Sequence, residues 1–286
     1  MIAVSIAACV AGGRIFPMSD LTVVLTSCRR PDLLVATLDA FFATNDYPLH
    51  EFIVIEDSDD ASVLDVPARY PGQPIRVILN GVNLGQHRSI DKAYSQVQTP
   101  YILHLEDDWT FPVKGIVARG IEVLKRDSQI GLVQLRADED LPAEIKKVSR
   151  AFGDPGYWKI PPAAHRVWHS LTFNPTLKRL ADYRQLPNGY AGFTSEAEIS
   201  LHYKDRGVIM AWLSDTKVTH LGYGRSNYGS KTPRNLAGWM QDVQRFFSTA
   251  TLKKWRRSVV RRVAHAKRKR NAGVGFPIDR HRLDLE

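Results

Sequence analysis

Residues 101–109 read Tyr-Ile-Leu-His-Leu-Glu-Asp-Asp-Trp, an apolar run that ends in three consecutive acids. The run predicts a buried strand at 101–105 with Glu106, Asp107 and Asp108 at its carboxyl end. Three adjacent carboxylates repel one another there unless a cation lies between them. Mg²⁺ and Mn²⁺ prefer such oxygen ligands and complete their shells with phosphate and water. The stretch therefore predicts a metal site, and a solvated acidic turn is the alternative.

A second acidic cluster follows another short apolar run about fifty residues upstream. Residues 51–55 predict a strand, and Glu56-Asp57-Ser58-Asp59-Asp60 comes directly after it. A carboxylate at such a strand end can accept hydrogen bonds from a nucleobase or from ribose hydroxyls. Alone this cluster is weak evidence, but the two clusters together suit a nucleotide that extends from its base to its diphosphate.

The acidic clusters belong to a chain in which predicted strands alternate with predicted helices. Strands are expected at 21–26, 51–55, 75–79, 101–105, 131–135 and 208–213, and helices from Pro31 and at 88–96, 113–126, 176–183 and 195–205. This alternation predicts an α/β fold with a mainly parallel central sheet flanked by helices. In such sheets ligands bind beyond the carboxyl ends of the strands, where both acidic clusters lie. Residues 137–169 lack a clear pattern and are predicted to be a long functional loop or lid.

Composition and cysteine usage place the chain among large globular domains. The 286 residues are 44% hydrophobic, enough for one large domain with an appendage. Only two cysteines are present, so neither a disulfide framework nor a Cys-rich zinc site is indicated, and a cytoplasmic location fits best. The apolar residues 2–10 are shorter than the roughly twenty that span a membrane and have no basic n-region before them. We expect residues 1–20 to form an N-terminal extension.

The positive charge of the chain is concentrated near its end. The formal net charge is +9, yet residues 251–270 alone contain ten Lys or Arg and no acid, so the rest of the chain sums to −1. We expect residues 249–286 to form a basic, helical C-terminal tail. Such a tail can bind an anionic membrane surface or DNA, and a solvated appendage is the alternative.

Several motifs together resemble the family 2 glycosyltransferases and the broader GT-A fold, over about residues 21–228. The similarity lies in Thr-Ser-Cys-Arg-Arg-Pro at 26–31, Ile-Val-Ile-Glu-Asp-Ser at 53–58, Asn-Leu-Gly at 83–85, and Glu-Asp-Asp at 106–108 in the place of the family's DxD motif. The resemblance implies a single GT-A (Rossmann-like) domain, with a nucleotide-sugar-binding half at 21–136 and an acceptor-binding, catalytic half at 137–248. It also implies a hexosyltransferase that moves a sugar from a nucleoside diphosphate, most often UDP, to a hydroxyl.

The same resemblance assigns roles around the donor. The residues that would contact the nucleotide are Thr26, Ser27, Arg30, Asp57, Arg88 and Asp107. Asp57 would hold the base and Asp107 the ribose side. Asp108 would bind Mn²⁺ or Mg²⁺ directly, and Glu106 replaces the first Asp of the usual motif.

A further acidic segment, Ser-Glu-Ala-Glu-Ile at 195–199, resembles the Glu-Asp-x-Asp-Leu segment of the family. By that likeness Glu196 would be the base that deprotonates the acceptor in an inverting, single-displacement transfer, and Glu198 is its rival. Capping of the helix that follows is the alternative for both acids.

His220 and the loop that follows it complete the predicted site. In several GT-A enzymes a histidine after the base joins the metal, and His220 stands at that place, although a lone His is as often structural. Arg225, in the glycine-rich loop 222–229, could clamp the diphosphate.

The motifs do not specify an acceptor, and three hypotheses for the function of the chain stay open. The first is synthesis of a surface polysaccharide or glycolipid, with the basic tail at the inner face of the membrane. The second is a transferase that acts on hydroxylated bases in DNA, with the tail on the phosphates. The third is a non-catalytic basic binding module on a GT-A-like core.

Overall fold

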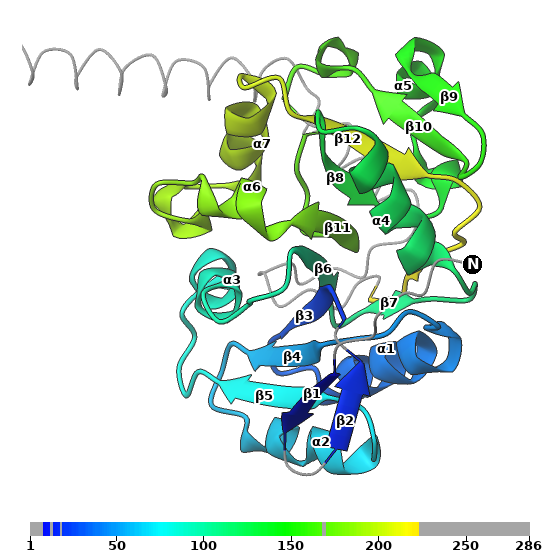
Figure 1. The fold of residues 1–286 in the computed structure, drawn as a ribbon. Coiled ribbons are helices and arrows are strands. Elements are labelled where there is room, and N and C mark those ends of the chain that lie inside the picture. Colours follow the sequence, from blue (N-terminus) through cyan, green and yellow to red (C-terminus); the bar gives the residue numbers. More distant parts are fainter. Residues whose placement is uncertain (1–7, 12–13, 18, 168–169, 223–286) are drawn as a thin grey trace, which may run out of the picture. The chain divides into compact units, whose positions relative to one another are not determined.

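The chain divides after Gly222 into two compact units, and the structure describes only residues of the first. The computed structural model describes residues 8–11, 14–17, 19–167 and 170–222 (Figure 1). The predicted basic tail, 249–286, and Arg225 lie outside these described residues. Within the predicted extension, β1 (Ala8–Ala11) and β2 (Arg14–Pro17) form a two-stranded antiparallel sheet.

One nine-stranded sheet organises the first unit, in the order β5-β4-β3-β6-β11-β8-β12-β10-β9. Its strands are β3 (Leu21–Ser27), β4 (Glu51–Glu56), β5 (Ile75–Leu79), β6 (Tyr101–Glu106), β8 (Ile130–Gln134), β9 (Arg150–Phe152), β10 (Tyr157–Ile160), β11 (Thr176–Arg179) and β12 (Ile209–Leu213). Because β11 lies between β6 and β8, the two predicted halves share one sheet.

The four strands β5, β4, β3 and β6 are parallel, as the sequence predicts. Their register sets Thr26 opposite Glu106 and Ser27 opposite Glu56. The polar residues after these strands therefore meet at one edge of the sheet. The other half is mixed, because β11 is antiparallel to both neighbours and β10 is antiparallel to β12, while β12 runs parallel to β8.

Helices cover both faces of the sheet and make a three-layer α/β/α arrangement. The α-helices in and beside the sheet are α1 (Pro31–Thr44), α2 (Val66–Arg69), α3 (Gln86–Tyr94), α4 (Ile116–Arg126), α5 (Ala143–Val148), α6 (Leu180–Arg184) and α7 (Glu196–Lys204). The apolar sides of α1 and α4 bury one face, and those of α3, α6 and α7 bury the other. None of the described helices is long and apolar enough to cross a bilayer.

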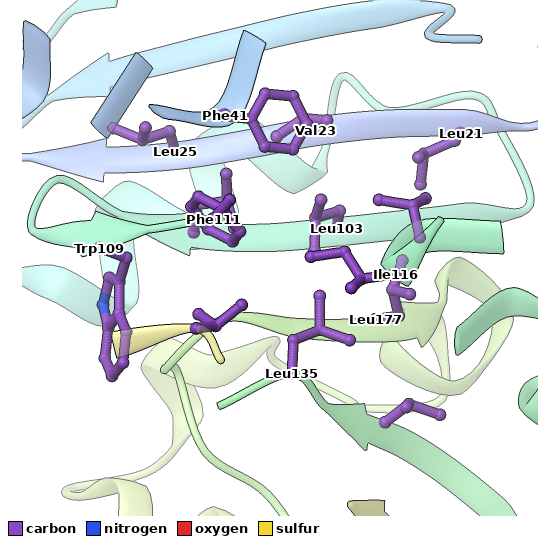
Figure 2. Close-up of a cluster of buried hydrophobic side chains, with 14 of the residues drawn as sticks. Leu21, Val23, Leu25, Phe41, Leu103, Trp109, Phe111, Ile116, Leu135 and Leu177 are labelled. Atoms are coloured by element: carbon purple, nitrogen blue, oxygen red, sulfur yellow. The ribbon is translucent and has the colours of Figure 1, made fainter. Parts of the chain in front are cut away.

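Period-two alternation in the strands sorts their side chains between these two faces. Leu103 of β6 and Leu177 of β11 pack with Phe41 of α1 and Ile116 of α4 in one core cluster (Figure 2). The intervening residues of the same strands, including His104 and Lys178, alternate to the opposite face, which α3, α6 and α7 cover. Buried strands and amphipathic helices thus fix the edge at which the acids lie.

The prediction of a helix at 176–183 is wrong for its first half. Residues 176–179 form β11, in the middle of the sheet, and only the residues from Leu180 onward are helical. The stretch Thr-Leu-Lys-Arg contains a single aliphatic residue, so its sequence shows no strand pattern. Backbone pairing with β6 and β8 overrides its local preference.

The loop or lid expected at 137–169 is also wrong in large part. This segment contains α5, β9 and β10, and β10 extends the sheet by pairing with β12. Leu141, Ile145 and Ile160 are buried in the core of the α3, α6 and α7 face. These apolar residues stand too far apart in sequence to reveal a period, although together they anchor the segment.

Candidate active site

The three acids after β6 are held inside the protein. Asp107 is 0% exposed and Asp108 is 4% exposed, whereas Glu106 is partly buried. A solvated acidic turn would leave these side chains in water, so that alternative does not describe the cluster. Buried carboxylates in this number require positive partners.

Arg30 supplies one such partner from the loop between β3 and α1. Its Nε donates to Asp107 Oδ2 at 3.2 Å, its Nη2 pairs with Asp107 Oδ1, and its Nη1 donates to Asp108 Oδ2 at 2.8 Å. The guanidinium thus holds Asp107 in a two-pronged pair and reaches Asp108 as well. The predicted contacts of Arg30 and Asp107 with a nucleotide stay predictions.

The three acids differ in their affinity for protons. Burial, together with the charges of Asp108, Glu196 and Asp107, raises the pKa of Glu106 to about 8. Burial raises the pKa of Asp107 to about 6, although Arg30 opposes the rise. Burial acts in the same sense on Asp108, but His220 and Arg30 outweigh it and lower its pKa. With the charges of the protein alone, Asp107 and Asp108 are therefore mainly carboxylates at neutral pH, whereas Glu106 keeps its proton.

His220 reaches the cluster through a separate two-stranded sheet. β13 (Thr219–His220) pairs antiparallel with β7 (Trp109–Thr110), and His220 stands opposite Trp109. This pairing brings His220 Nε2 to 3.1 Å from Asp108 Oδ2, and the imidazole lies edge-on to the Trp109 ring, with 5.0 Å between the ring centroids. The sequence could suggest this contact only through the family resemblance, because the two residues are far apart in the chain.

Gly222 closes the chain tightly over Asp108. A Cβ built at Gly222 would lie 2.4 Å from Asp108 Oδ2 and 2.9 Å from its Cβ. The backbone amide of Leu221 also donates to the carbonyl oxygen of Asp108 at 2.6 Å. Only a residue without a side chain fits this close approach.

The donor set of Asp108 and His220 fits a divalent cation of the Mn²⁺ or Mg²⁺ type. Asp108 Oδ1 is buried and has no hydrogen-bond partner among the described residues, and His220 places an imidazole nitrogen beside Oδ2. A carboxylate and an imidazole are suitable ligands, and phosphates and water usually fill the remaining positions. Among the described residues no group of three or more His, Cys, Asp or Glu side chains is placed to hold a metal ion, and the predicted part of Glu106 in the metal site stays a prediction.

On the β4 side, Asp57 is engaged by the protein itself. Its Oδ1 accepts from the backbone amide of Leu84 at 2.7 Å and from Asn80 Nδ2 at 3.0 Å, and its Oδ2 accepts from the amide of Gly85 at 2.9 Å. Asp57 therefore holds the Asn-Leu-Gly loop in front of α3. Its predicted contact with the base stays a prediction.

The remaining residues predicted around the nucleotide lie at or near the same sheet edge. Ser27 is buried, and Thr26 Oγ1 donates to the carbonyl of Leu105 at 3.4 Å. Arg88 is exposed on α3. Gln86, two residues earlier, donates to Glu106 Oε1 at 3.2 Å and was missed by the sequence analysis, since no motif singled it out.

The two acids of α7 have different surroundings. Glu198 Oε2 accepts from the backbone amide of Thr194 at 2.8 Å and from its hydroxyl at 2.7 Å, while Ser195 caps the helix by accepting from the Glu198 amide. Glu198 is thus part of a capping arrangement. Glu196, on the other hand, lies near enough to Glu106 for its charge to raise the pKa of that acid.

The carboxyl group of Glu196 is held by the loop before β11. Burial raises the pKa of Glu196, while hydrogen bonds from the Thr172 hydroxyl and the Phe173 backbone, together with the charge of Lys178, oppose the rise. Thr172, Phe173 and Lys178 were not predicted as site residues, because they carry no motif.

Comparison with known proteins identifies the family. The family model described as glycosyl transferase family 2 matches residues 22–193. A search among curated protein sequences finds no match. Solved structures, by contrast, show the same fold at low sequence identity.

Three of these structures illustrate the likeness. The mannosyltransferase PcManGT from Pyrobaculum calidifontis, in complex with GDP-Man and Mn²⁺, has a TM-score of 0.56 and 15% identity, covering 73% of this chain and 58% of that one. TarS 1–349 of S. aureus, in complex with UDP-GlcNAc, has a TM-score of 0.54 and 14% identity, covering 74% and 62%. GalNAc-T7 with UDP, GalNAc and Mn²⁺ has a TM-score of 0.54 and 12% identity, covering 70% and 43%.

The chain spans less than two thirds of the length of these proteins, and at such identities the likeness shows the fold alone. The family model, however, covers more than half of the chain and includes both acidic clusters. Together with the sheet order, this match shows that the chain belongs to glycosyl transferase family 2 and has the GT-A fold.

Proposed function

We propose that the chain is a metal-dependent hexosyltransferase that moves a sugar from a nucleoside diphosphate, with UDP as the nucleotide, to an acceptor hydroxyl. One observation carries this proposal. The Asp108–His220 pair and the separate, partly buried acid Glu196 both adjoin the acidic cluster at the carboxyl edge of the parallel strands. This arrangement supports a cation site and a base close to each other, which the chemistry of sugar transfer requires.

Asp108 and His220 would hold Mn²⁺ or Mg²⁺ on the donor side. The bound cation would neutralise the charge that develops on the departing diphosphate. Thr26, Ser27, Asp57 and Arg88 would line the nucleotide, as the family resemblance implies, and Arg225 would clamp the diphosphate. The structures of PcManGT and GalNAc-T7 contain Mn²⁺, which supports a divalent cation here.

Glu196 would act on the acceptor. As the acceptor oxygen attacks the anomeric carbon, the Glu196 carboxylate takes its proton, and the diphosphate leaves from the opposite side of the sugar. A single displacement of this kind inverts the anomeric configuration. The raised pKa of Glu196, caused by burial, makes it a stronger base than an exposed glutamate. Glu198 is less suited, because Thr194 occupies its Oε2.

For the acceptor we propose a polysaccharide or glycolipid, with residues 251–270 at an anionic membrane surface. The ten basic residues of that segment support the proposal, because lipid-linked acceptors lie at such surfaces. A DNA acceptor would instead place the tail on phosphates. Co-sedimentation of the full chain with vesicles of anionic phospholipid, and separately with duplex DNA, would distinguish the two. Binding to the vesicles supports the membrane surface, and binding to the duplex alone supports DNA.

The donor site is tested by calorimetric titration of the full chain with UDP, GDP and dTDP, each with and without Mn²⁺. We expect metal-dependent binding of UDP. If no nucleotide bound in the presence of the metal, the transferase proposal would be wrong and the non-catalytic binding module would replace it.

The base is tested by substitution at the two acids of α7. Glu196→Gln should lower the release of UDP from its sugar donor by roughly 100-fold or more, because general-base catalysis contributes about that much, and leave donor affinity within about twofold. Glu198→Gln is the matched control and should retain most of the turnover. The opposite result would move the base to Glu198.

A further inference from the structure

Lys178 is a charged side chain that the proposed reaction does not use. It lies on β11, in the middle of the sheet, and the residue is 3% exposed. Its Nζ is buried and has no hydrogen-bond partner among the described residues. An ammonium without hydrogen bonds is costly inside a protein, whereas a methionine would pack at the same place without that cost. A buried lysine at this position therefore indicates that its charge has a role.

Three aromatic rings surround the Lys178 ammonium. Its Nζ lies 5.6 Å from the ring centroid of Phe173, 5.8 Å from that of Tyr190 and 5.9 Å from that of Tyr94. Ring faces attract a cation and partly replace its lost hydration. Burial nevertheless lowers the pKa of Lys178 to about 7, and the charge of Glu196 opposes this effect. The aromatic cage thus holds a cation whose attractive partner is the proposed base.

The Lys178 cage and Glu196 are joined through one short loop. The Phe173 ring forms a wall of the cage, while the backbone of the same residue and the Thr172 hydroxyl hydrogen-bond to Glu196. Glu196 therefore lies near both Lys178 and Glu106, because the charge of Lys178 lowers the pKa of Glu196 and the charge of Glu196 raises the pKa of Glu106.

Four other titratable groups around Lys178 carry no charge at neutral pH. His104, on β6, is fully buried, and burial together with Lys178 holds its pKa well below the usual range. Tyr94 and Tyr190 are fully buried as well, and burial holds their pKa values well above it. Tyr203 on α7 is neutral for the same reason. The Asp182 carboxylate, which lines the same small cavity as Lys178, is paired with Arg179, and Lys178 is the cation whose charge lowers the pKa of Glu196.

We propose that Lys178 is a positioning residue for Glu196: its buried ammonium is the opposite charge that keeps the Glu196 side chain ionised. The inference deepens the proposed function, because it rests on Glu196 as the base. It assigns a role to a strand residue that lies outside the family motifs quoted above. Lys178 acts through Glu196 and contacts neither donor nor acceptor in this role.

The direct test is a carbon-13 NMR titration of the full chain labelled at the glutamate δ-carbon. The chain has nine glutamates, and Glu196→Gln identifies the resonance of Glu196. In Lys178→Met we expect the midpoint of the Glu196 titration to rise by roughly one pH unit or more, because a nearby opposite charge is lost. Methionine has a similar volume and should preserve the fold.

His104→Phe is the matched control. It removes a polar group that packs against the Tyr94 and Phe173 rings of the cage and replaces it with another ring, but it changes no charge, so the Glu196 midpoint should stay in place. An unchanged midpoint in Lys178→Met, or an equal shift in His104→Phe, would overturn the inference. A reciprocal measurement checks the pair: in Glu196→Gln the midpoint of the Lys178 ε-carbon resonance should fall by a similar amount.

Turnover separates the positioning role from a structural one. If Lys178 positions the base, the acid limb of the kcat profile in Lys178→Met should move to higher pH while the donor KM stays the same. A uniform loss of kcat at every pH would contradict the role. The NMR titration needs no substrate, so it tests the effect of Lys178 on Glu196 independently of sugar transfer. If the wild-type chain transferred no sugar, only the proposed function would be wrong.

Discussion

The two acidic clusters look alike in the sequence and differ in the structure. Both follow a buried strand, and Asp57 and Asp108 are both nearly inaccessible to solvent. Asp57, however, accepts two backbone amides and one side-chain amide from residues 80–85, so that both of its oxygens are used. Asp108 leaves Oδ1 without a partner among the described residues and turns Oδ2 toward Arg30 and His220.

The difference shows what turns a buried carboxylate into a candidate functional group. Amides of the same chain satisfy Asp57, which makes it a structural support of a loop. Asp108 is surrounded by other acids, a guanidinium and an imidazole, and its buried Oδ1 has no partner among the described residues, an arrangement that fits a cation. Burial raises the pKa of the two neighbouring acids, to about 8 for Glu106 and to about 6 for Asp107.

The largest effect is expected for Asp108→Asn. Loss of the metal-binding oxygen should weaken Mn²⁺-dependent binding of UDP by roughly 100-fold or more, since even residues behind a metal ligand change affinity by about 10–100-fold. Binding without metal should not weaken, because the substitution removes a negative charge from beside the diphosphate. Calorimetry with Mn²⁺ and with EDTA measures both parts. Equal losses in the two conditions would mean that Asp108 supports the fold and not a cation.

A smaller effect, on stability, is expected for Asp57→Asn. The new amide group would face backbone N–H groups, so at least one charged hydrogen bond is lost and the free energy of unfolding should fall by about 2 kcal/mol. Urea denaturation measures the change. Asp59→Asn is the control, because Asp59 belongs to the same cluster but lies exposed in an ion pair with Arg29. If Asp57→Asn were as stable as the control, the contrast between the two clusters would disappear.

The sequence predicted the parallel half of the fold well, for an identifiable reason. β3, β4 and β6 are mostly apolar, buried runs that end in polar residues, and such runs are typical of buried parallel strands. β11 escaped prediction because its pairing with β6 and β8 involves residues distant in sequence.

The site was predictable where a motif marks it and not elsewhere. Glu106 to Asp108 were identified by three adjacent charges after a buried run. The role of Asp57 depends on donors from residues 80–85, which no pattern connects to it. Lys178 stands in a stretch that reads as a polar helix, so its burial follows from tertiary structure alone.

The smallest expected effect is a change in how stability depends on pH. Because burial raises the pKa of Glu106 to about 8 in the folded chain, the folded state keeps a proton that the unfolded state releases above its ordinary pKa near 4.5. The folded state therefore binds more protons in this window, and the free energy of unfolding falls as pH rises from about 4.5 to about 8.

Glu106→Gln removes the ionisable group and should reduce that fall. In metal-free protein we expect Glu106→Gln to raise the free energy of unfolding, relative to the wild-type chain, by about 1 kcal/mol more at pH 8 than at pH 5. This value is smaller than the pKa shift alone would give, because Glu106 is partly exposed and solvent screens its charge. Urea denaturation at the two pH values measures it. Glu56→Gln should act in the opposite direction at pH 8, because the Arg29 amide and the Ser58 hydroxyl would lose a charged acceptor. If Glu56→Gln raised the free energy of unfolding, the carboxylates of both clusters would repel their neighbours. The distinction between the clusters would then rest on His220 alone.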